Sequence, residues 1–345
     1  MGTIRVSPRR LLALAVAMCV AASAPAMASA ALLTQSPPSA AEFASAQDPA
    51  PGDGRAMRYQ GGRVLLDPRV YVVFWGSEWG QPDAKGMPTS DPLGVAPVVV
   101  DFFSRLGGKG DTWSPILTQY CSGTKINDKS CGPGSRKMPR MTKSPLRGWW
   151  VDTSPGPSQS DVDNRMGARD EVTDRALKHF RATHPDDIVV LMLPPGTSSA
   201  NCSAFHSAAG TAANGPRAVI GIPYPLPACP SNKPPVCPLG EPVECLPTTE
   251  VAITQWASHE YAEAVTNPFP YNCVNPTGVC GWIVKDAPAW ASRQGQTTEI
   301  SDTCSYYRWV QLNGKKVSVA VLWSNTANKG QGGCVAKYLS DGNQS

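Results

Sequence analysis

Two side chains that can bind a metal lie one helical turn apart in the segment 256–265. His259 and Glu263 occupy positions i and i+4 of a segment whose composition favours a helix, so both lie on the same face. Glu260 lies between them and can act as a general base toward water, as in the His-Glu-x-x-His helix of zinc proteases, whose second histidine is here Glu263. On spacing alone, a solvated helix face with i,i+4 hydrogen bonding is the favoured interpretation of these residues.

An acidic pair downstream can supply a third ligand. Glu299 and Asp302 are three residues apart, next to Cys304, which a disulfide can hold in place. Because two ligands on one helix need another from elsewhere, we predict that His259 and Glu263 bind the metal and that Asp302 or Glu299 completes the site. The predicted ion is Zn²⁺, with another divalent metal or no metal as alternatives. The alternative for the acidic pair is a capped turn in which Asp302 accepts backbone amides.

The chain has only four histidines, which limits the sites that can be built. His206 follows Cys202 in a segment that we interpret as a loop. We expect His206 to be an additional ligand, a hydrogen-bond donor toward substrate, or a structural histidine. His179 and His184 lie in the basic end of a predicted helix, where the helix dipole favours histidine, and we assign them no chemistry.

Other catalytic motifs are missing from the sequence. There is no Gly-x-Ser-x-Gly elbow, no Gly-x-Gly-x-x-Gly turn and no phosphate-binding loop. The acidic residues of the helix and of the downstream pair can also be drawn as the two carboxylates of a glycoside hydrolase, and ten tryptophans would suit sugar stacking. We rank that interpretation last.

Hydrophobic patterning predicts the elements that position these residues. Continuous apolar runs typical of buried strands cover 70–76, 187–193 and 218–222. Shorter strands are expected at 64–66, 148–152 and 317–323, and helices at 97–106, 160–184 and 250–265, the last capped by Thr248 or Thr249. The pattern predicts an α/β fold, a single disulfide-stapled domain with a mixed sheet and a late metal-binding-type helix, in the element order of zincins.

The amino terminus has the features of an export signal. A basic segment up to Arg10 precedes an apolar run at 11–22, which is shorter than the roughly 20 residues that span a bilayer, and small residues follow at 28–30. We predict a signal peptide at 1–30, a flexible leader or linker at 31–60 and a secreted α/β domain at 61–345, without a membrane anchor.

The net charge of +4 arises mostly from this segment, because three arginines and no acids lie in the first ten residues. The rest of the chain is nearly neutral and has no basic stripe, which argues against nucleic acid as a partner.

The cysteines support an oxidising compartment. Of the 11 cysteines, Cys19 leaves with the predicted signal peptide and an even number remains. Sequential pairing is our working hypothesis, although spacing alone does not determine connectivity. The pairs would be Cys121/Cys131, Cys202/Cys229, Cys237/Cys245, Cys273/Cys280 and Cys304/Cys334.

These motifs, in this order, resemble the phosphate-induced/EXORDIUM-like secreted proteins, and their bacterial relatives more closely. The resemblance is carried by Ser-His-Glu-x-x-Glu-x-x-Thr-Asn-Pro at 258–268, Gly-Trp at 281–282, Glu-Ile-x-Asp-x-Cys at 299–304 and Leu-Trp-Ser-Asn at 322–325. The segments 202–207 and 71–75 are also similar to that family. The resemblance implies an extracellular or wall-associated location and implies little about a reaction.

We therefore expect a secreted metal-dependent hydrolase, a zinc peptidase above all, acting as a monomer on an extracellular polypeptide or a wall polymer. The alternative is a non-catalytic extracellular protein of the EXORDIUM-like type, in which the same residues form a structural metal site or a hydrogen-bonded cluster. Bound metal and the activity of a Glu260→Gln variant separate the two.

Overall fold

The computed structural model describes residues 56–158, 169–197, 204–210, 215–225, 248–273, 279–284, 299–304 and 307–338. All of them belong to the unit formed by residues 39–345. Within these ranges, no helix combines the length and the apolar character that crossing a bilayer requires. The predicted signal peptide at 1–30 lies outside the described residues.

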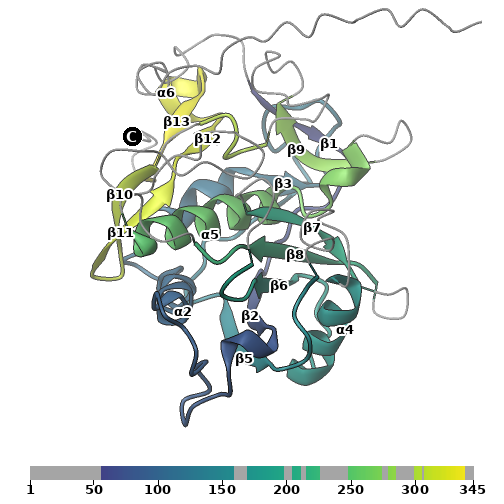
Figure 1. The fold of residues 1–345 in the computed structure, drawn as a ribbon. Helices are drawn as coiled ribbons and strands as arrows, with labels where there is room; N and C mark the ends of the chain where they lie inside the picture. Colours follow the sequence, from purple (N-terminus) through teal and green to yellow (C-terminus); the bar gives the residue numbers. More distant parts are fainter. Residues whose placement is uncertain are drawn as a thin grey trace, which may run out of the picture. The chain divides into compact units, whose positions relative to one another are not determined.

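A five-stranded sheet forms the centre of the described structure (Figure 1). Its strands run in the order β5, β2, β6, β8, β7, of which the first four are parallel and β7 is antiparallel to β8. The bounds are β5 (Leu146–Asp152), β2 (Arg69–Trp75), β6 (Asp187–Met192), β8 (Arg217–Ile222) and β7 (Phe205–Ala209). The sheet confirms the predicted α/β class with a mixed sheet, whereas the zincin-like order stays a prediction.

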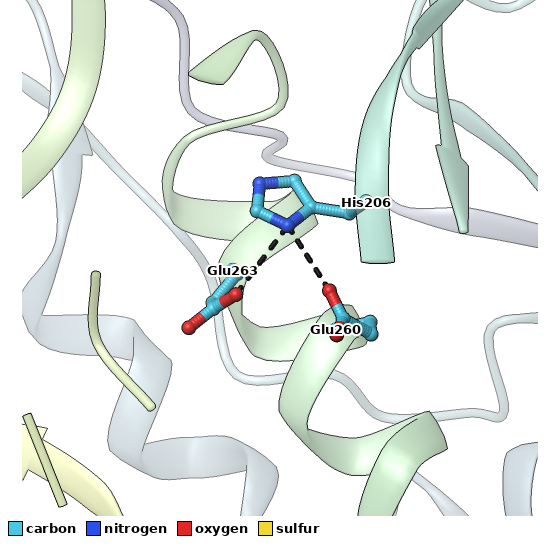
Figure 2. A group of neighbouring side chains, drawn as sticks. All are labelled: His206, Glu260 and Glu263. Carbon is cyan, nitrogen blue, oxygen red and sulfur yellow. Dashed lines mark hydrogen bonds and ion pairs between the residues drawn. The ribbon is translucent and has the colours of Figure 1, made fainter. Parts of the chain in front are cut away.

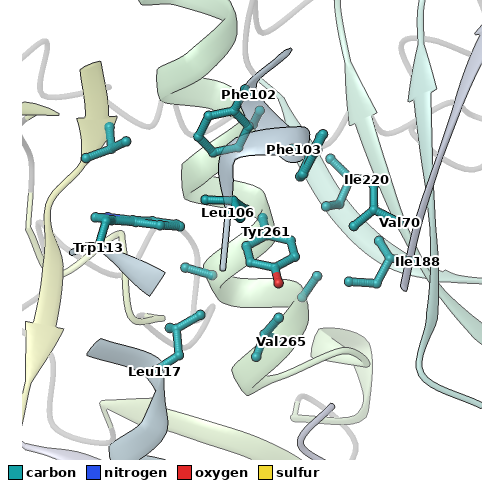
Figure 3. Packing of buried hydrophobic residues seen from close by; sticks show 14 of the residues in the cluster. Val70, Phe102, Phe103, Leu106, Trp113, Leu117, Ile188, Ile220, Tyr261 and Val265 are labelled. Carbon is teal, nitrogen blue, oxygen red and sulfur yellow. The ribbon is translucent and has the colours of Figure 1, made fainter. Parts of the chain in front are cut away.

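Helices cover both faces of the sheet, which explains why its central strands are apolar without alternation. On one face, Val70, Val72 and Phe74 of β2 belong to the large core that also contains residues of α2 (Val95–Arg105) and α5 (Thr249–Thr266). On the other face, the alternate residues of β2 pack with α4 (Arg169–Phe180). Figure 3 shows the larger core around Tyr261, between α2 and the sheet.

Helix α5 is buried along most of its length. It begins where the hydroxyl of Thr248 accepts a 3.2 Å hydrogen bond from the backbone N–H of Val251, which is the predicted N-cap. The helix packs against α2, β8, β7 and the hairpin strand β11 (Lys315–Ala320). Because protein surrounds it, its acidic residues Glu260 and Glu263 are nearly inaccessible to solvent. Carboxylates at such positions need partners.

Smaller paired strands surround this core. The pairs are β1 (Met57–Gln60) with β9 (Cys280–Val284), β3 (Cys121–Ser122) with β4 (Arg136–Lys137), β10 (Tyr307–Leu312) with β11, and β12 (Leu322–Ser324) with β13 (Gly333–Val335). The short helices are η1 (Ser77–Trp79), η2 (Ser114–Gln119), η3 (Pro270–Cys273) and α6 (Ala327–Gly330).

Three of the elements expected from the sequence differ from the structure. The expected strand at 64–66 is wrong, because the backbone N–H groups there bond to scattered partners, Leu65 to the carbonyl of Val265 and Leu66 to the carboxylate of Asp186. Strand β1 lies inside the predicted leader 31–60 and pairs with β9, so residues 57–60 belong to the folded domain. Of the predicted helix 160–184, α4 forms the part from Arg169 to Phe180, residues 160–168 lie outside the described residues, and 181–184 are not helical, so His184 lies beyond the end of the helix.

Three of the proposed disulfides are confirmed: Cys121–Cys131, Cys273–Cys280 and Cys304–Cys334. The other four predicted partners lie outside the described residues: Cys202, Cys229, Cys237 and Cys245. Disulfides of this kind persist in oxidising environments, so the three bonds indicate an extracellular or equivalent compartment.

Candidate metal centre

Three separate elements bring acidic and imidazole side chains together. The middle of α5 carries His259, Glu260 and Glu263, strand β7 carries His206, and the turn at 299–304 carries Glu299 and Asp302. His206 therefore lies on a strand at the edge of the central sheet, not in the loop that the sequence suggested. Its ring points from β7 toward α5 (Figure 2).

The first group of donor atoms is buried, and we call it the buried group. Nδ1 of His206 lies 3.2 Å from Oε2 of Glu260 and 3.4 Å from Oε2 of Glu263, as the dashed lines in Figure 2 show. The exposed fraction of the three side chains is 4% for His206, 7% for Glu260 and 4% for Glu263. Water therefore has little access to this group.

The second group opens toward solvent, and we call it the open group. Nε2 of His259 lies 3.2 Å from Oε1 of Glu263 and 3.4 Å from Oδ1 of Asp302. The side chains of His259 and Asp302 are 28% and 43% exposed. Asp302 also donates its backbone N–H to Oε1 of Glu263 over 3.3 Å, which joins the turn to the helix.

Glu263 belongs to both groups, with one carboxylate oxygen in each. Its Oε2 faces His206 and its Oε1 faces His259. The nitrogen and oxygen atoms of each group lie within 4.8 Å of one another. Ligands at about 2.0–2.2 Å from a tetrahedral zinc ion lie about 3.3–3.6 Å apart, so the observed separations suit a metal as well as an ion pair. These residues can therefore hold a divalent cation on either side of Glu263.

The far nitrogen of His206 establishes which tautomer a neutral ring adopts. Nε2 lies 3.2 Å from the backbone carbonyl oxygen of Asn267, which can only accept, so Nε2 carries a hydrogen. In the neutral ring Nδ1 then has the lone pair, and it faces the carboxylates of Glu260 and Glu263. A lone pair facing two carboxylates is repulsive. The contact therefore requires a proton, on Nδ1 or on one of the carboxyl groups, or a metal ion between them.

Glu299 lies outside both groups, on the opposite side of the His206 ring. Its Oε1 accepts a 2.6 Å hydrogen bond from the side-chain amide of Asn267 and lies 3.4 Å from Nε2 of His206. This contact orients the imidazole. Glu299, which the sequence predicted as a ligand, thus contacts His206 and Asn267, and Asn267 is a residue of the site that the prediction missed.

Strand β9 approaches the end of α5 so closely that position 281 accommodates only glycine. The Gly281 N–H donates to the side-chain oxygen of Asn267 over 2.8 Å. A Cβ atom on Gly281 would lie 1.9 Å from the carbonyl oxygen of Thr266, so a larger residue would push the end of α5 away from β9. The Cys273–Cys280 disulfide fastens the same region. Together these contacts fix Asn267, and through it Glu299 and His206.

The turn that carries Glu299 and Asp302 is held on several sides. Cys304 is bonded to Cys334, and Trp323 donates its backbone N–H to the carbonyl of Ile300 over 2.9 Å. The hydroxyl of Ser301 donates to the carbonyl of His259 over 3.2 Å. The rigid acidic turn expected from the sequence thus returns to α5.

Burial and the neighbouring charges shift the acid–base equilibria of the whole cluster. Burial raises the pKa of Glu260, and it raises the pKa of Glu299 to about 7. Burial alone would raise the pKa of Glu263 too, but the two imidazoles hold its pKa well below the ordinary value. Burial disfavours the charged form of His206 and His259, yet the surrounding carboxylates raise the pKa of both well above the ordinary value.

The cluster has more carboxylates than imidazoles. Four carboxylates face two imidazoles, and no Lys or Arg in the described ranges forms an ion pair with Glu260, Glu263, Glu299 or Asp302. The surplus of negative charge favours the binding of cations.

The structure thus unites three of the predicted ligands, His259, Glu263 and Asp302, in the open group. Glu260, predicted as the general base, faces His206 in the buried group. His206, expected as a possible additional ligand, lies at the centre of that group. No family model, curated protein or solved structure matches this chain, so the geometry of the site carries the functional argument.

Proposed function

We propose that this protein is an exported metal-dependent hydrolase whose catalytic cation binds the open group of His259, Glu263 and Asp302. The observation that carries the proposal is the convergence of these three donors where solvent reaches them, next to carboxylates that solvent barely reaches. A substrate needs such access, and of the two groups the open one offers it.

The residues of the open group have distinct tasks in this proposal. His259 and Glu263 hold the cation from one helix face, and Asp302 closes the site from the turn fastened by Cys304. A bound divalent cation would polarise a carbonyl oxygen and make water more acidic. Because Glu263 is buried and accepts the N–H of Asp302, it keeps one oxygen directed at the open group without substrate.

Zinc and a peptide substrate are the specific form of this proposal. Imidazole and carboxylate ligands suit Zn²⁺, and two ligands one helical turn apart with a third from a downstream turn follow the arrangement of zinc peptidases. Sequence order assigns Glu260 the role of proton acceptor, whereas its contact with His206 supports a role in the buried group. The proposal for the open group does not depend on which role Glu260 has.

Export is the part of the proposal supported by sequence and structure together. The amino-terminal 30 residues have the pattern of a signal peptide, and three disulfides fasten the described domain. We propose that the protein acts outside the cell on a polypeptide.

A second candidate is a non-catalytic extracellular protein with a structural cation. The burial of His206, Glu260 and Glu263 favours it, because structural metal sites are closed to solvent. Such a protein would bind metal and fold without cleaving any polymer.

The decisive experiment compares metal content with proteolysis. The full chain is produced by export into an oxidising compartment, its zinc is counted by mass spectrometry, and cleavage of casein is followed. We expect His259→Gln and Asp302→Ala to lower cleavage by about 100-fold or more, the order lost with a key electrostatic contact to the transition state. Glu171→Gln is the matched control, because Glu171 is 76% exposed on α4.

The outcome separates the candidates. If metal-depleted protein cleaves casein as well as zinc-loaded protein, the metal-dependent hydrolase is refuted. If the protein holds metal and shows no cleavage of casein or of a panel of wall polymers, the non-catalytic candidate is supported instead.

A further inference from the structure

We infer that the buried group binds a second divalent cation through Nδ1 of His206, Glu260 and Glu263, and that the Glu263 carboxylate bridges it to the cation of the open group. The inference rests on the proposed function in taking the open group as the catalytic site, and it assigns the buried group to a dinuclear centre. The juxtaposition that carries it is one carboxylate whose two oxygens face two different imidazoles.

The direction of the two Glu263 oxygens is the first argument. A carboxylate that served a single ion or hydrogen bond could leave its second oxygen to any donor. Here Oε1 lies 3.2 Å from Nε2 of His259, and Oε2 lies 3.4 Å from Nδ1 of His206. Each imidazole in turn faces one further carboxylate, Asp302 for His259 and Glu260 for His206. The two sides of Glu263 therefore repeat the same donor set of one imidazole and two carboxylates.

The hydrogen bonding of His206 is the second argument. A metal-ligating histidine generally donates its other ring N–H to a carbonyl or carboxylate, which fixes the tautomer and the ring orientation. His206 has both partners at Nε2, the Asn267 carbonyl at 3.2 Å and Glu299 at 3.4 Å. The free lone pair is thereby directed at Glu260 and Glu263, which is the arrangement required for a ligand.

Charge balance is the third argument. Glu260, Glu263, Glu299 and Asp302 together carry four negative charges when ionised, and no Lys or Arg among the described residues pairs with them. One divalent cation with two neutral imidazoles leaves the centre negative. Two divalent cations neutralise it with both imidazoles in the neutral state that metal ligation requires.

The assignment gives Glu260 a role other than proton acceptor. As a ligand of the buried cation it carries no proton in the loaded protein, and its contact with His206 is the contact between two neighbouring ligands. A Glu260→Gln variant would then lose a metal ion. If Glu260 were instead the general base, the Glu260→Gln variant would lose activity and keep its full metal content.

The test counts ions in the full-length exported chain. After saturation with Zn²⁺ and removal of the excess, we expect two zinc ions per chain in the wild type. His259→Gln should retain one, through the buried group, and His206→Gln and Glu260→Gln should each retain one, through the open group. Glu171→Gln on α4 should keep both.

Manganese provides an independent, spectroscopic measurement of the distance between the two ions. Two Mn²⁺ ions that share a carboxylate are magnetically coupled, so their electron paramagnetic resonance spectrum should lack the isolated six-line signal. Loading the wild type with Mn²⁺ should give the coupled spectrum, and Glu260→Gln should restore the six-line signal.

Saturation of the wild type at one zinc per chain, with an isolated Mn²⁺ signal, would overturn the inference. So would a Glu260→Gln variant that keeps two ions. The proposed function fails in a different way. Two ions bound without cleavage of casein or of the panel of wall polymers refute the hydrolase and leave the dinuclear centre. A wild type that binds one ion and cleaves casein, together with a His259→Gln variant that loses that ion, refutes the second ion alone.

Discussion

The two sides of the Glu263 carboxylate have the same kinds of donor and different access to water. On one side His206 and Glu260 are 4% and 7% exposed, and on the other His259 and Asp302 are 28% and 43% exposed. The buried side is built from a sheet strand and a helix. The open side is built from the same helix and a turn that a disulfide fastens.

The difference in solvent access suits the buried side to a structural cation and the open side to a catalytic one. A cation on the buried side would be surrounded by protein and would contribute to folding, because its ligands would otherwise be buried charges facing one another. A cation on the open side can meet a substrate and can exchange. The comparison predicts that stability follows the buried side and activity follows the open side, with Glu263 affecting both.

Loss of Glu263 should have the largest effect. Glu263→Ala removes the carboxylate that both groups share and leaves His206 and His259 without it. We expect both zinc ions to be lost, casein cleavage to disappear and the free energy of unfolding to fall by about 3–5 kcal/mol, the cost of breaking a buried charge pair. Urea unfolding and zinc analysis measure these changes. Glu250→Gln, in the first turn of the same helix, is the control, and an equal loss there would show that α5 is generally sensitive.

Removal of metal by a chelator should proceed in two steps. The ion in the open group should leave first and take the activity with it, and the buried ion should leave later and take the thermal stability with it. A loss of 1 kcal/mol shifts Tm by roughly 2–4 °C in domains of about 150–250 residues, so the second step should be visible in a melting curve. Zinc release, cleavage and Tm are followed in the same samples. Simultaneous loss of activity and stability would indicate that the two sides of Glu263 form a single metal site.

Much of the framework that separates the two sides was predictable from the sequence. The strands β2, β6 and β8 are continuous apolar runs, and the hydroxyl of Thr248 caps α5 as expected. Such signals depend on residues close together in the chain. The grouping of His259 with Glu263 is of this kind, since one helical turn determines it.

The buried side was not predictable in the same way. Strand β7 reads Phe-His-Ser-Ala-Ala, which lacks the β-branched residues that mark a strand. Its edge position and its pairing with β8 bring His206 to Glu260 across 54 positions in sequence. The expected strand at 64–66 failed for a related reason. Val64 and Leu65 are buried and Leu66 is partly buried, while the N–H groups of Leu65 and Leu66 bond to a helix carbonyl and to Asp186. Burial alone does not distinguish a strand from a core loop.

The pH dependence of stability should have opposite signs with and without metal. In metal-free protein the pKa values of His206, His259, Glu260 and Glu299 are raised, so the folded state binds more protons than the unfolded state and stability falls as pH rises. For Glu299 this loss occurs between its ordinary value of 4.5 and about 7, and for the histidines it continues above their ordinary value of 6.5. The lowered pKa of Glu263 acts in the opposite sense only at more acidic pH.

Zinc-loaded protein should become more stable across the same interval, because deprotonated ligands bind the cation more tightly. Melting temperatures between about pH 5 and 8, measured with zinc and after chelation, test the two signs. Parallel curves would mean that the cluster binds no metal.

Glu299 offers a smaller and more selective change. Glu299→Gln keeps the size of the side chain and weakens its contact with Nε2 of His206 and with the Asn267 amide. Partners of metal ligands typically affect metal affinity by about 10–100-fold, and we expect a loss in this range confined to the ion in the buried group. Competition with a chromophoric chelator resolves the two affinities. If the affinity of the open group changed instead, Glu299 would be a ligand of the same cation as His259, as the sequence suggested.

The smallest expected effect lies at the start of the helix that carries both groups. Thr248→Ala removes the cap on the N–H of Val251 and should destabilise the protein by about 1 kcal/mol. Because His259 lies about three turns further along α5, we expect two zinc ions per chain and unchanged cleavage. Urea unfolding, zinc analysis and casein cleavage are measured together. Loss of zinc in this variant would show that both groups depend on the stability of the whole helix. Retention of zinc would show that the contacts of β7 and of the acidic turn determine the difference between the two sides of Glu263.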